Sequence, residues 1–156
     1  MCHLYGWYST RYRDQVKRRT PECDNVSQSR NNGEYMARIT GIDHVQLVMP
    51  VGGEAQAREF YRNVLRLTEI PKPPVLAVRG GLWFQCGASQ IHLGGDLGFQ
   101  AAKKAHPALC VEDLHGFIGA LVAIGVEVLP EERVEGRDRV SVFDPFGNRI
   151  ELISPR

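Results

Sequence analysis

The sequence predicts an α+β fold built from two βαβββ modules with mixed sheets. The same order of expected elements occurs twice, over residues 41–95 and 105–154. A histidine opens each module (His44 and His106, 62 residues apart), and a possible ligand lies on each closing strand (His92 and Glu151, 59 residues apart). An internal repeat constrains the whole fold, because each repeat is one supersecondary unit. Pseudo-twofold symmetry should therefore bring these four side chains toward one concave surface.

The first module follows from its periodicities. GIDHVQLVMP alternates as a strand does, with His44, Gln46 and Val48 on one face. GGEAQAREFYRNVLRL has apolar residues at helical spacing, and the prolines of IPKPP are expected to end that helix. Three short strands then follow, PVLAVRG, GLWFQCG and SQIHLGG, with glycine-containing turns between them.

The second module repeats this order. HPALCVED reads as a strand, and Asp113 is a good N-cap for the helix LHGFIGALVAIG, which Gly125 ends. VEVLPEE, RVSVFDP and NRIELIS supply the last three strands.

The length of 156 residues suits one domain, but the chain changes character near Met36. Residues 1–35 hold only three aliphatic side chains, at Leu4, Val16 and Val26. We therefore expect residues 1–36 to be a disordered N-terminal extension and residues 37–156 to form the domain. Two alternatives stay open: the aromatic residues and the basic run at 17–19 form a docking segment, or Met36 is the natural start.

Composition limits the partners. The formal net charge of +1 offers no electrostatic footprint for nucleic acid or an anionic membrane, and no apolar run is long enough to span a bilayer. The N-terminus lacks the apolar centre of a secretory signal, which predicts a cytoplasmic protein with a small-molecule partner. The four cysteines form no CxxC pair, so Cys86 and Cys110 are expected to be small buried hydrophobes in a reducing compartment.

The segments IDHVQLVMP, AREFYRNVLRL, AHPALCVEDL and VFDPFGNRIELI together resemble the vicinal-oxygen-chelate superfamily, which includes glyoxalases, bleomycin resistance proteins and dioxygenases. The resemblance covers about residues 39–154. It implies a glyoxalase-like fold whose curled sheets form a cup, a divalent metal in that cup in many members, and modules often paired across a homodimer. The implied metal ligands are His44, His92, His106 and Glu151. In glyoxalase I proteins the position of His92 is typically glutamate, and this departure argues against isomerisation of a glutathione hemithioacetal.

Two imidazoles and a carboxylate suit zinc, nickel, manganese or iron with positions left open for substrate. Such a metal acts as a Lewis acid, and Glu151 is the candidate general base. His92 is either a fourth ligand or an acid–base group. Arg149 lies two residues before Glu151 on the same strand face, where it either orients a substrate carboxylate or phosphate or pairs with Glu151.

Other residues are expected around this site. Gln46 shares a face with His44 and either binds substrate or only lines the cup. Trp83 and Phe84 point to opposite faces of one strand, so one should line the cup and the other should pack beneath the helices. Lys103 and Lys104 precede His106 and either attract an anionic substrate or are solvated loop residues.

The preferred function is a metal-dependent enzyme of glyoxalase type, a lyase or isomerase, that acts on a small oxygenated substrate chelated by the metal. A metal-free small-molecule or drug-binding protein, as in bleomycin resistance, is the alternative from another class. An extradiol-type dioxygenase and a thiol transferase of the same superfamily also remain open, because fold-level analogy cannot select among these chemistries.

Overall fold

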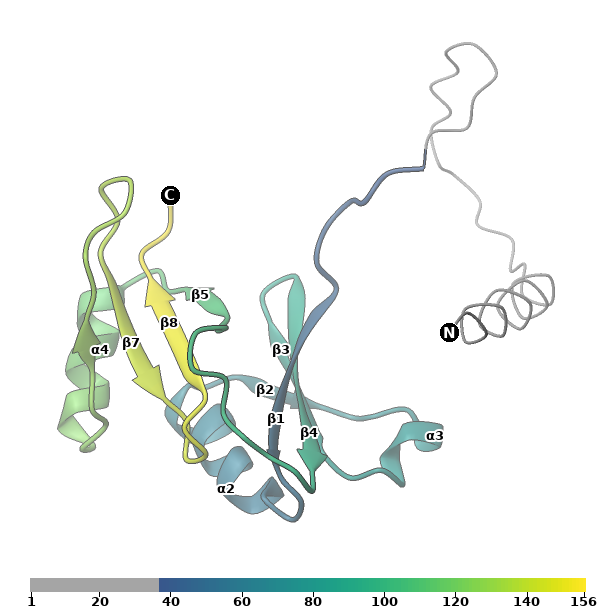
Figure 1. The fold of residues 1–156 in the computed structure, drawn as a ribbon. Helices are drawn as coiled ribbons and strands as arrows, with labels where there is room; N and C mark the ends of the chain where they lie inside the picture. The colour runs from purple at the N-terminus through teal and green to yellow at the C-terminus, as the bar shows by residue number, and fades with distance from the viewer. Residues whose placement is uncertain (1–36) are drawn as a thin grey trace, which may run out of the picture. The chain divides into compact units, whose positions relative to one another are not determined.

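Two four-stranded mixed sheets form the described part of the protein, residues 37–156 of this computed structural model (Figure 1). The prediction of a disordered extension over residues 1–36 lies outside the described residues. The first sheet has the strand order β1 (His44–Pro50), β4 (Ser89–Asp96), β3 (Leu82–Cys86) and β2 (Thr68–Ile70). The second sheet has the order β5 (Ala108–Cys110), β8 (Arg149–Ile153), β7 (Arg139–Phe143) and β6 (Leu129–Pro130). The predicted βαβββ repeat is confirmed.

The strand register confirms the repeat residue by residue. In each sheet the first strand of the module runs parallel to the last, β1 beside β4 and β5 beside β8. Gln46 lies opposite His92 in the first sheet, and Ala108 lies opposite Glu151 in the second. His92 and Glu151 therefore occupy equivalent positions on the last strands of the two modules, as their spacing in the sequence predicted.

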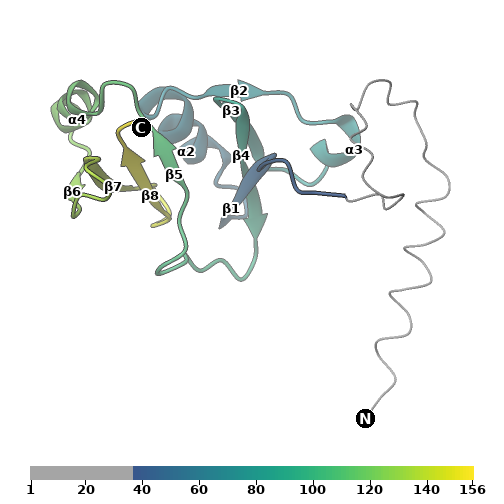
Figure 2. The same ribbon diagram turned by 90° about the horizontal axis from the view of Figure 1, so that it is seen from above.

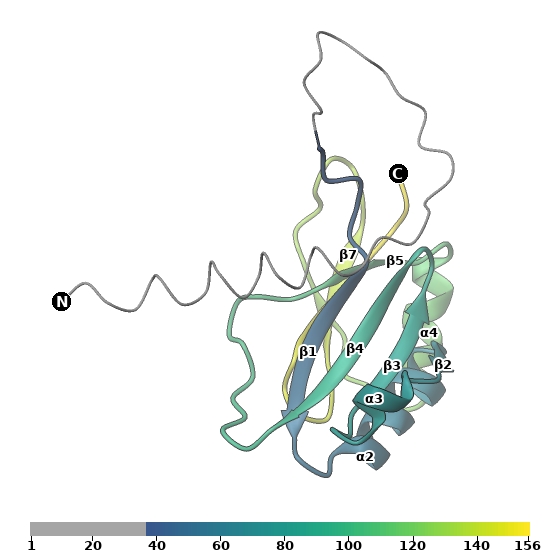
Figure 3. The ribbon, with the colours of Figure 1, turned by 90° about the vertical axis from the view of Figure 1, so that its right-hand side faces the viewer.

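Helices cover one face of each sheet, as Figures 2 and 3 show. They are α2 (Glu54–Arg58), continued by the π-helical turn η1 (Glu59–Val64), and α4 (Leu114–Ala123). One hydrophobic core joins the helices to both sheets, and its largest fully buried side chains are Tyr61, Phe84, Met49, Leu93, Leu121, Ile150 and Leu152. These helices leave the opposite face of each sheet uncovered, and we call it the helix-free face; the short helix α3 (Pro74–Ala77) lies on that side of the first sheet.

The predicted cap of the second helix is confirmed. The Asp113 side chain accepts a hydrogen bond from the Gly116 amide at 2.9 Å. Gly125 follows the helix with a φ of 80°, a left-handed conformation that glycine adopts without steric cost. No helix among the described residues is long and apolar enough to cross a membrane.

The strand predicted at PVLAVRG is wrong. Its first residues form a short helix, α3 (Pro74–Ala77), and the second strand of the module is β2, which precedes the prolines. Pro73 and Pro74 have no N–H to donate to a sheet, and a proline at the first helical position is already set for helix. The prediction that the prolines of IPKPP end the first helix is also wrong, because the helix ends at Val64, the chain turns at Arg66 with a φ of 59°, and β2 comes before the prolines.

A buried hydrogen-bond network joins the two modules at the DPFGN turn. The Asp144 carboxylate accepts hydrogen bonds from the Tyr61 hydroxyl at 2.8 Å and from the Asn148 amide nitrogen at 2.8 Å. Asn148 Nδ2 donates to the Val48 carbonyl of β1 at 2.8 Å. This turn therefore fixes the start of β8, the strand that carries Arg149 and Glu151, against the first module.

Candidate functional site

Polar and aromatic side chains gather on the helix-free face of the first sheet. Trp83, His92 and His44 stack one on another there: Trp83 on β3 lies opposite His92 on β4, and His44 on β1 lies diagonally from it, opposite Gln90. The His92 ring centroid lies 4.0 Å from that of Trp83 and 4.1 Å from that of His44, with interplanar angles of 2° and 16°. Phe84, the next residue on β3, points the other way and stacks on Tyr61 in the core. The expectation that Trp83 and Phe84 divide between the two faces is confirmed.

His92 is buried and held on three sides. Its two ring faces are covered by Trp83 and His44, and its Nε2 lies 2.8 Å from Gln90 Oε1. Burial lowers the pKa of His92, and the neighbouring His44 lowers it further. His92 is therefore a neutral imidazole at neutral pH, and its Nε2 is already engaged by Gln90.

His44 presents a free nitrogen on this face. Its Nδ1 lies 2.7 Å from Asp43 Oδ1, and a carboxylate at that distance favours the tautomer with the proton on Nδ1. The unprotonated Nε2 is then available as a ligand. Gln46 extends across the sheet toward Gly94, where a Cβ would come within 2.6 Å of its Nε2. The absence of a side chain at Gly94 therefore makes room for Gln46.

The second sheet carries the other pair of predicted ligands. His106 Nε2 lies 3.4 Å from Glu151 Oε2, and His106 Nδ1 lies 2.7 Å from the Lys104 carbonyl oxygen. A carbonyl can only accept, so Nδ1 carries a proton, and Nε2 is the ring nitrogen that faces Glu151. The Glu151 amide donates to the Pro107 carbonyl at 3.0 Å, which ties the segment of His106 to β8.

Two arginines surround the buried Glu151 carboxylate. Arg139 Nη1 donates to Glu151 Oε2 at 2.8 Å, and Arg149 Nη2 lies 3.9 Å from the same oxygen. Arg149 also donates to Glu131 Oε1 at 2.8 Å, so it serves both carboxylates. The Ser141 hydroxyl lowers the pKa of Glu131 by hydrogen bonding, and Arg149 adds to this effect.

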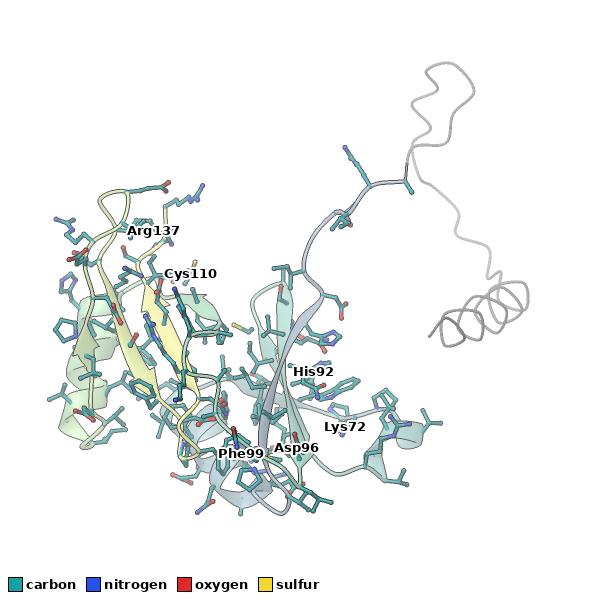
Figure 4. The ribbon with its side chains drawn as sticks, in the orientation of Figure 1. Lys72, His92, Asp96, Phe99, Cys110 and Arg137 are labelled. Atoms are coloured by element: carbon teal, nitrogen blue, oxygen red, sulfur yellow. The ribbon has the colours of Figure 1, made fainter. Side chains whose placement is uncertain are left out.

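The structure brings the predicted site residues together in two pairs. His44 lies with His92 on the first sheet, and His106 lies with Glu151 on the second. Among residues 37–156 no three histidine, cysteine, aspartate or glutamate side chains are placed to hold one metal ion. Figure 4 shows His92 on the side of the first sheet that faces away from the second module. The four side chains therefore do not converge within one described chain.

Several residues of these clusters were not singled out from the sequence. They are Asp43, Gln90, Glu131, Arg139 and Ser141. A usable signal existed for the last two: in RVSVF, Arg139 and Ser141 alternate with Val140 and Val142, which places the polar pair on the face opposite the core. No comparable signal marked Glu131, because its loop position has no periodicity.

Two minor expectations have different outcomes. Cys86 packs against the core, but Cys110 is exposed at the end of β5, with Arg137 Nη2 at 3.6 Å from its sulfur (Figure 4). The prediction that Cys110 is buried is wrong, because its side chain lies on the helix-free face of a three-residue strand. Lys103 and Lys104 are exposed, and it is the backbone carbonyl of Lys104 that contacts His106.

Comparison with known proteins identifies the family. The model of the glyoxalase/bleomycin resistance protein/dioxygenase superfamily matches residues 41–152, which span both modules. The chain belongs to this superfamily. A solved structure of a Bacillus anthracis protein assigned to the glyoxalase family is 44% identical, with a TM-score of 0.75 over 78% of this chain and 100% of that one.

More distant superfamily members share the fold alone. A fosfomycin resistance protein from Listeria monocytogenes is 20% identical, with a TM-score of 0.61 over 76% of this chain and 96% of that one. A lactoylglutathione lyase from Agrobacterium tumefaciens is also 20% identical, with a TM-score of 0.60 over 75% and 95%. No curated protein matches the sequence.

Proposed function

We propose that this superfamily member is a metal-dependent enzyme of glyoxalase type, a lyase or isomerase, whose site is completed by a second copy of the chain. The observation that carries the proposal is the His106–Glu151 pair, with Nε2 and Oε2 3.4 Å apart. An imidazole nitrogen and a carboxylate oxygen at this separation, both directed at the same space, form two adjacent ligands for a divalent ion.

The hydrogen bonds behind the ligands support this proposal. Metal-binding histidines typically donate their second ring nitrogen to a carbonyl or carboxylate, which fixes the ring and its tautomer. His106 has the Lys104 carbonyl in that place, and His44 has the Asp43 carboxylate. Two imidazoles and one carboxylate fit zinc, nickel, manganese or iron, and a bound ion would supply Lewis-acid polarisation of a substrate oxygen.

A second copy is needed because one chain holds the ligands in separate pairs. We propose a homodimer in which His44 of one copy faces His106 and Glu151 of the other. A twofold axis makes such an interface self-complementary, so each dimer contains two equivalent sites.

The remaining residues of the face have roles around the substrate. Trp83 supplies a flat apolar wall, Gln46 a hydrogen-bonding amide, and Arg149 a positive charge beside Glu151. Glu151 and His92 stay the candidates for proton transfer. His92 is the more constrained of the two, because Gln90 already hydrogen-bonds its Nε2. To act as a fourth metal ligand, His92 would have to bind the ion through Nδ1.

A metal-free binding protein is the second candidate, and one observation favours it. Arg139 already neutralises Glu151 at 2.8 Å, as a structural ion pair would. The extradiol-type dioxygenase and the thiol transferase use the same kind of ligand set, so the identity of the metal would separate them from the preferred function.

Metal analysis of protein purified without chelators tests the proposal. We expect about one divalent ion per chain, and loss of that ion in His106→Ala. His115→Ala is the matched control, because His115 lies exposed on α4, where its Nε2 is 3.9 Å from Asp138 Oδ2. Wild-type protein that binds no divalent ion, yet binds a bulky aromatic ligand, would favour the second candidate.

Mixing two inactive variants tests the shared site. His44→Ala and His106→Ala each remove a ligand, so neither homodimer should bind metal. After unfolding and refolding together at equal amounts, half of the dimers are mixed, and each mixed dimer regains one complete site. The expected content is about 0.25 ion per chain. A content of zero in refolded dimers contradicts a site shared between copies.

A further inference from the structure

The strongest unassigned feature is the pair of guanidinium groups held beside Glu151. Arg139 Nη1 and Arg149 Nη2 approach the same carboxylate oxygen, at 2.8 Å and 3.9 Å. Like charges repel at such separations, so the arrangement is stable only while anions lie between them. Here those anions are Glu151 and Glu131, and two positive charges balance two negative ones.

Both guanidinium groups are fixed from behind. Arg139 Nε donates to the Glu132 carbonyl at 2.6 Å, and Arg149 Nε donates to the Ser141 hydroxyl at 2.8 Å. Within the described residues Arg139 Nη2 and Arg149 Nη1 have no hydrogen-bond partner in the protein, and both side chains are about one-fifth exposed. Each arginine therefore offers donors to the open face of the sheet while its position is held.

Metal binding would upset the charge balance. If Glu151 is a metal ligand, a divalent ion adds two positive charges to a cluster that was neutral, and it takes the oxygen that Arg139 now holds. Arg139 cannot withdraw without breaking its bond to the Glu132 carbonyl. The loaded site therefore has a fixed guanidinium in need of an anion, directly beside the metal.

The first module has no guanidinium pair; the cation near its face is Lys72, which donates to the Gly80 carbonyl and contributes to the lowered pKa of His92. The position equivalent to Arg149 is Gln90, and the one equivalent to Glu151 is His92. The guanidinium pair beside a carboxylate is thus confined to the face of the second sheet, which gives a substrate one orientation.

We infer that the substrate carries an anionic oxygen group, a carboxylate, phosphate or phosphonate, and that Arg139 is the residue that binds it. Arg149 assists from the other side of Glu151. The inference rests on the proposed function, because Arg139 releases Glu151 only if Glu151 binds the metal. It adds to that proposal that the substrate must be negatively charged and that Arg139 determines this specificity.

Calorimetric titration of the full chain with Mn²⁺ and with methylphosphonate tests the inference without any activity assay. Dimethyl methylphosphonate, which has the same core and no charge, is the ligand control. Arg139→Met removes the charge and keeps most of the side-chain volume. Arg133→Met is the matched protein control, since Arg133 pairs with Asp138 on the surface. The thermal midpoint of each variant verifies folding.

Arg139→Met should change the two affinities in opposite directions. Mn²⁺ should bind tighter, by roughly threefold or more, because no guanidinium competes for Glu151. Methylphosphonate should bind to the Mn²⁺-loaded variant at least about tenfold more weakly than to loaded wild type, because a charge-assisted pair is lost. Arg133→Met should change neither affinity, and the uncharged ester should bind no variant measurably.

Three results would overturn the inference: unchanged methylphosphonate affinity in Arg139→Met, weaker Mn²⁺ binding in that variant, or a wild type that binds Mn²⁺ and ignores the anion. Failure of the proposed function looks different. In that case the wild type binds no divalent ion, Arg139 keeps its bond to Glu151, and methylphosphonate binds neither the wild type nor Arg139→Met.

Discussion

Asp144 should be the most stability-sensitive polar residue of the described domain. Its buried carboxylate accepts four hydrogen bonds: from the Tyr61 hydroxyl, the Phe146 amide, the Asn148 amide and Asn148 Nδ2, at 2.8 to 2.9 Å. Bonds to a charged acceptor contribute about 1.5 to 3 kcal/mol each, and they are not additive. We expect Asp144→Ala to lower the free energy of unfolding by roughly 3 to 5 kcal/mol.

The contact between modules can be isolated with a double-mutant cycle. Tyr61→Phe removes one bond to the carboxylate and should cost about 1.5 to 3 kcal/mol in the wild-type background. In Asp144→Ala the Tyr61 hydroxyl is left buried without its acceptor, at a penalty of roughly 1 to 3 kcal/mol. Adding Tyr61→Phe to Asp144→Ala should therefore leave stability unchanged or raise it.

Urea unfolding followed by circular dichroism measures all four free energies. Asp96→Ala, at the exposed end of β4, is the control and should cost less than about 1 kcal/mol. An equal cost of Tyr61→Phe in both backgrounds would show that the hydroxyl and the carboxylate do not interact. The assignment of this network as the link between modules would then be refuted.

Three further effects should appear in the same assay. Gly81→Ala should cost roughly 3 kcal/mol or more, because its φ is +80° and a Cβ would meet backbone, whereas Gly125→Ala, also at +80° but in open space, should cost about 1 kcal/mol. The Arg58 partner lowers the pKa of Glu69, so the stability from this pair is present above pH 4.5 and is lost as the pH falls further; Glu69→Gln should flatten that acid limb. Asp113→Ala should cost about 1 kcal/mol through loss of the helix cap.

Periodicity predicted the elements that have strong local signals. The alternation in β1, the glycine-bounded β3 and β4, and the Asp113 cap of α4 are all local, so the sequence alone was sufficient. The spacing of His44, His92, His106 and Glu151 also predicted which pairs share a sheet, because the register of a duplicated module repeats with its sequence.

Tertiary arrangement was beyond those signals. The apolar run PVLAV suits a strand by composition, and the missing N–H groups of two prolines decided the outcome. Arg139 was not recognised because its partner, Glu151, is close only across the β7–β8 pairing. The predicted ligands form two separate pairs because of the way the two sheets are oriented relative to each other. No local sequence pattern predicts that orientation.

The difference between the two modules bears on how copies should pair. The helix-free face of the first sheet carries the aromatic stack of Trp83, His92 and His44, with Asp43 and Lys72 beside it. That of the second sheet carries Arg139 and Glu151. Facing two first modules would give four histidines, and their nearest carboxylates, those of Asp43, are already engaged by His44. Facing two second modules would oppose two arginine clusters. The pairing of unlike modules supplies the imidazoles of His44 and His106 and the carboxylate of Glu151 without opposing the two arginine clusters. A twofold dimer makes that pairing twice, so an enzyme of this design should have as many sites as chains.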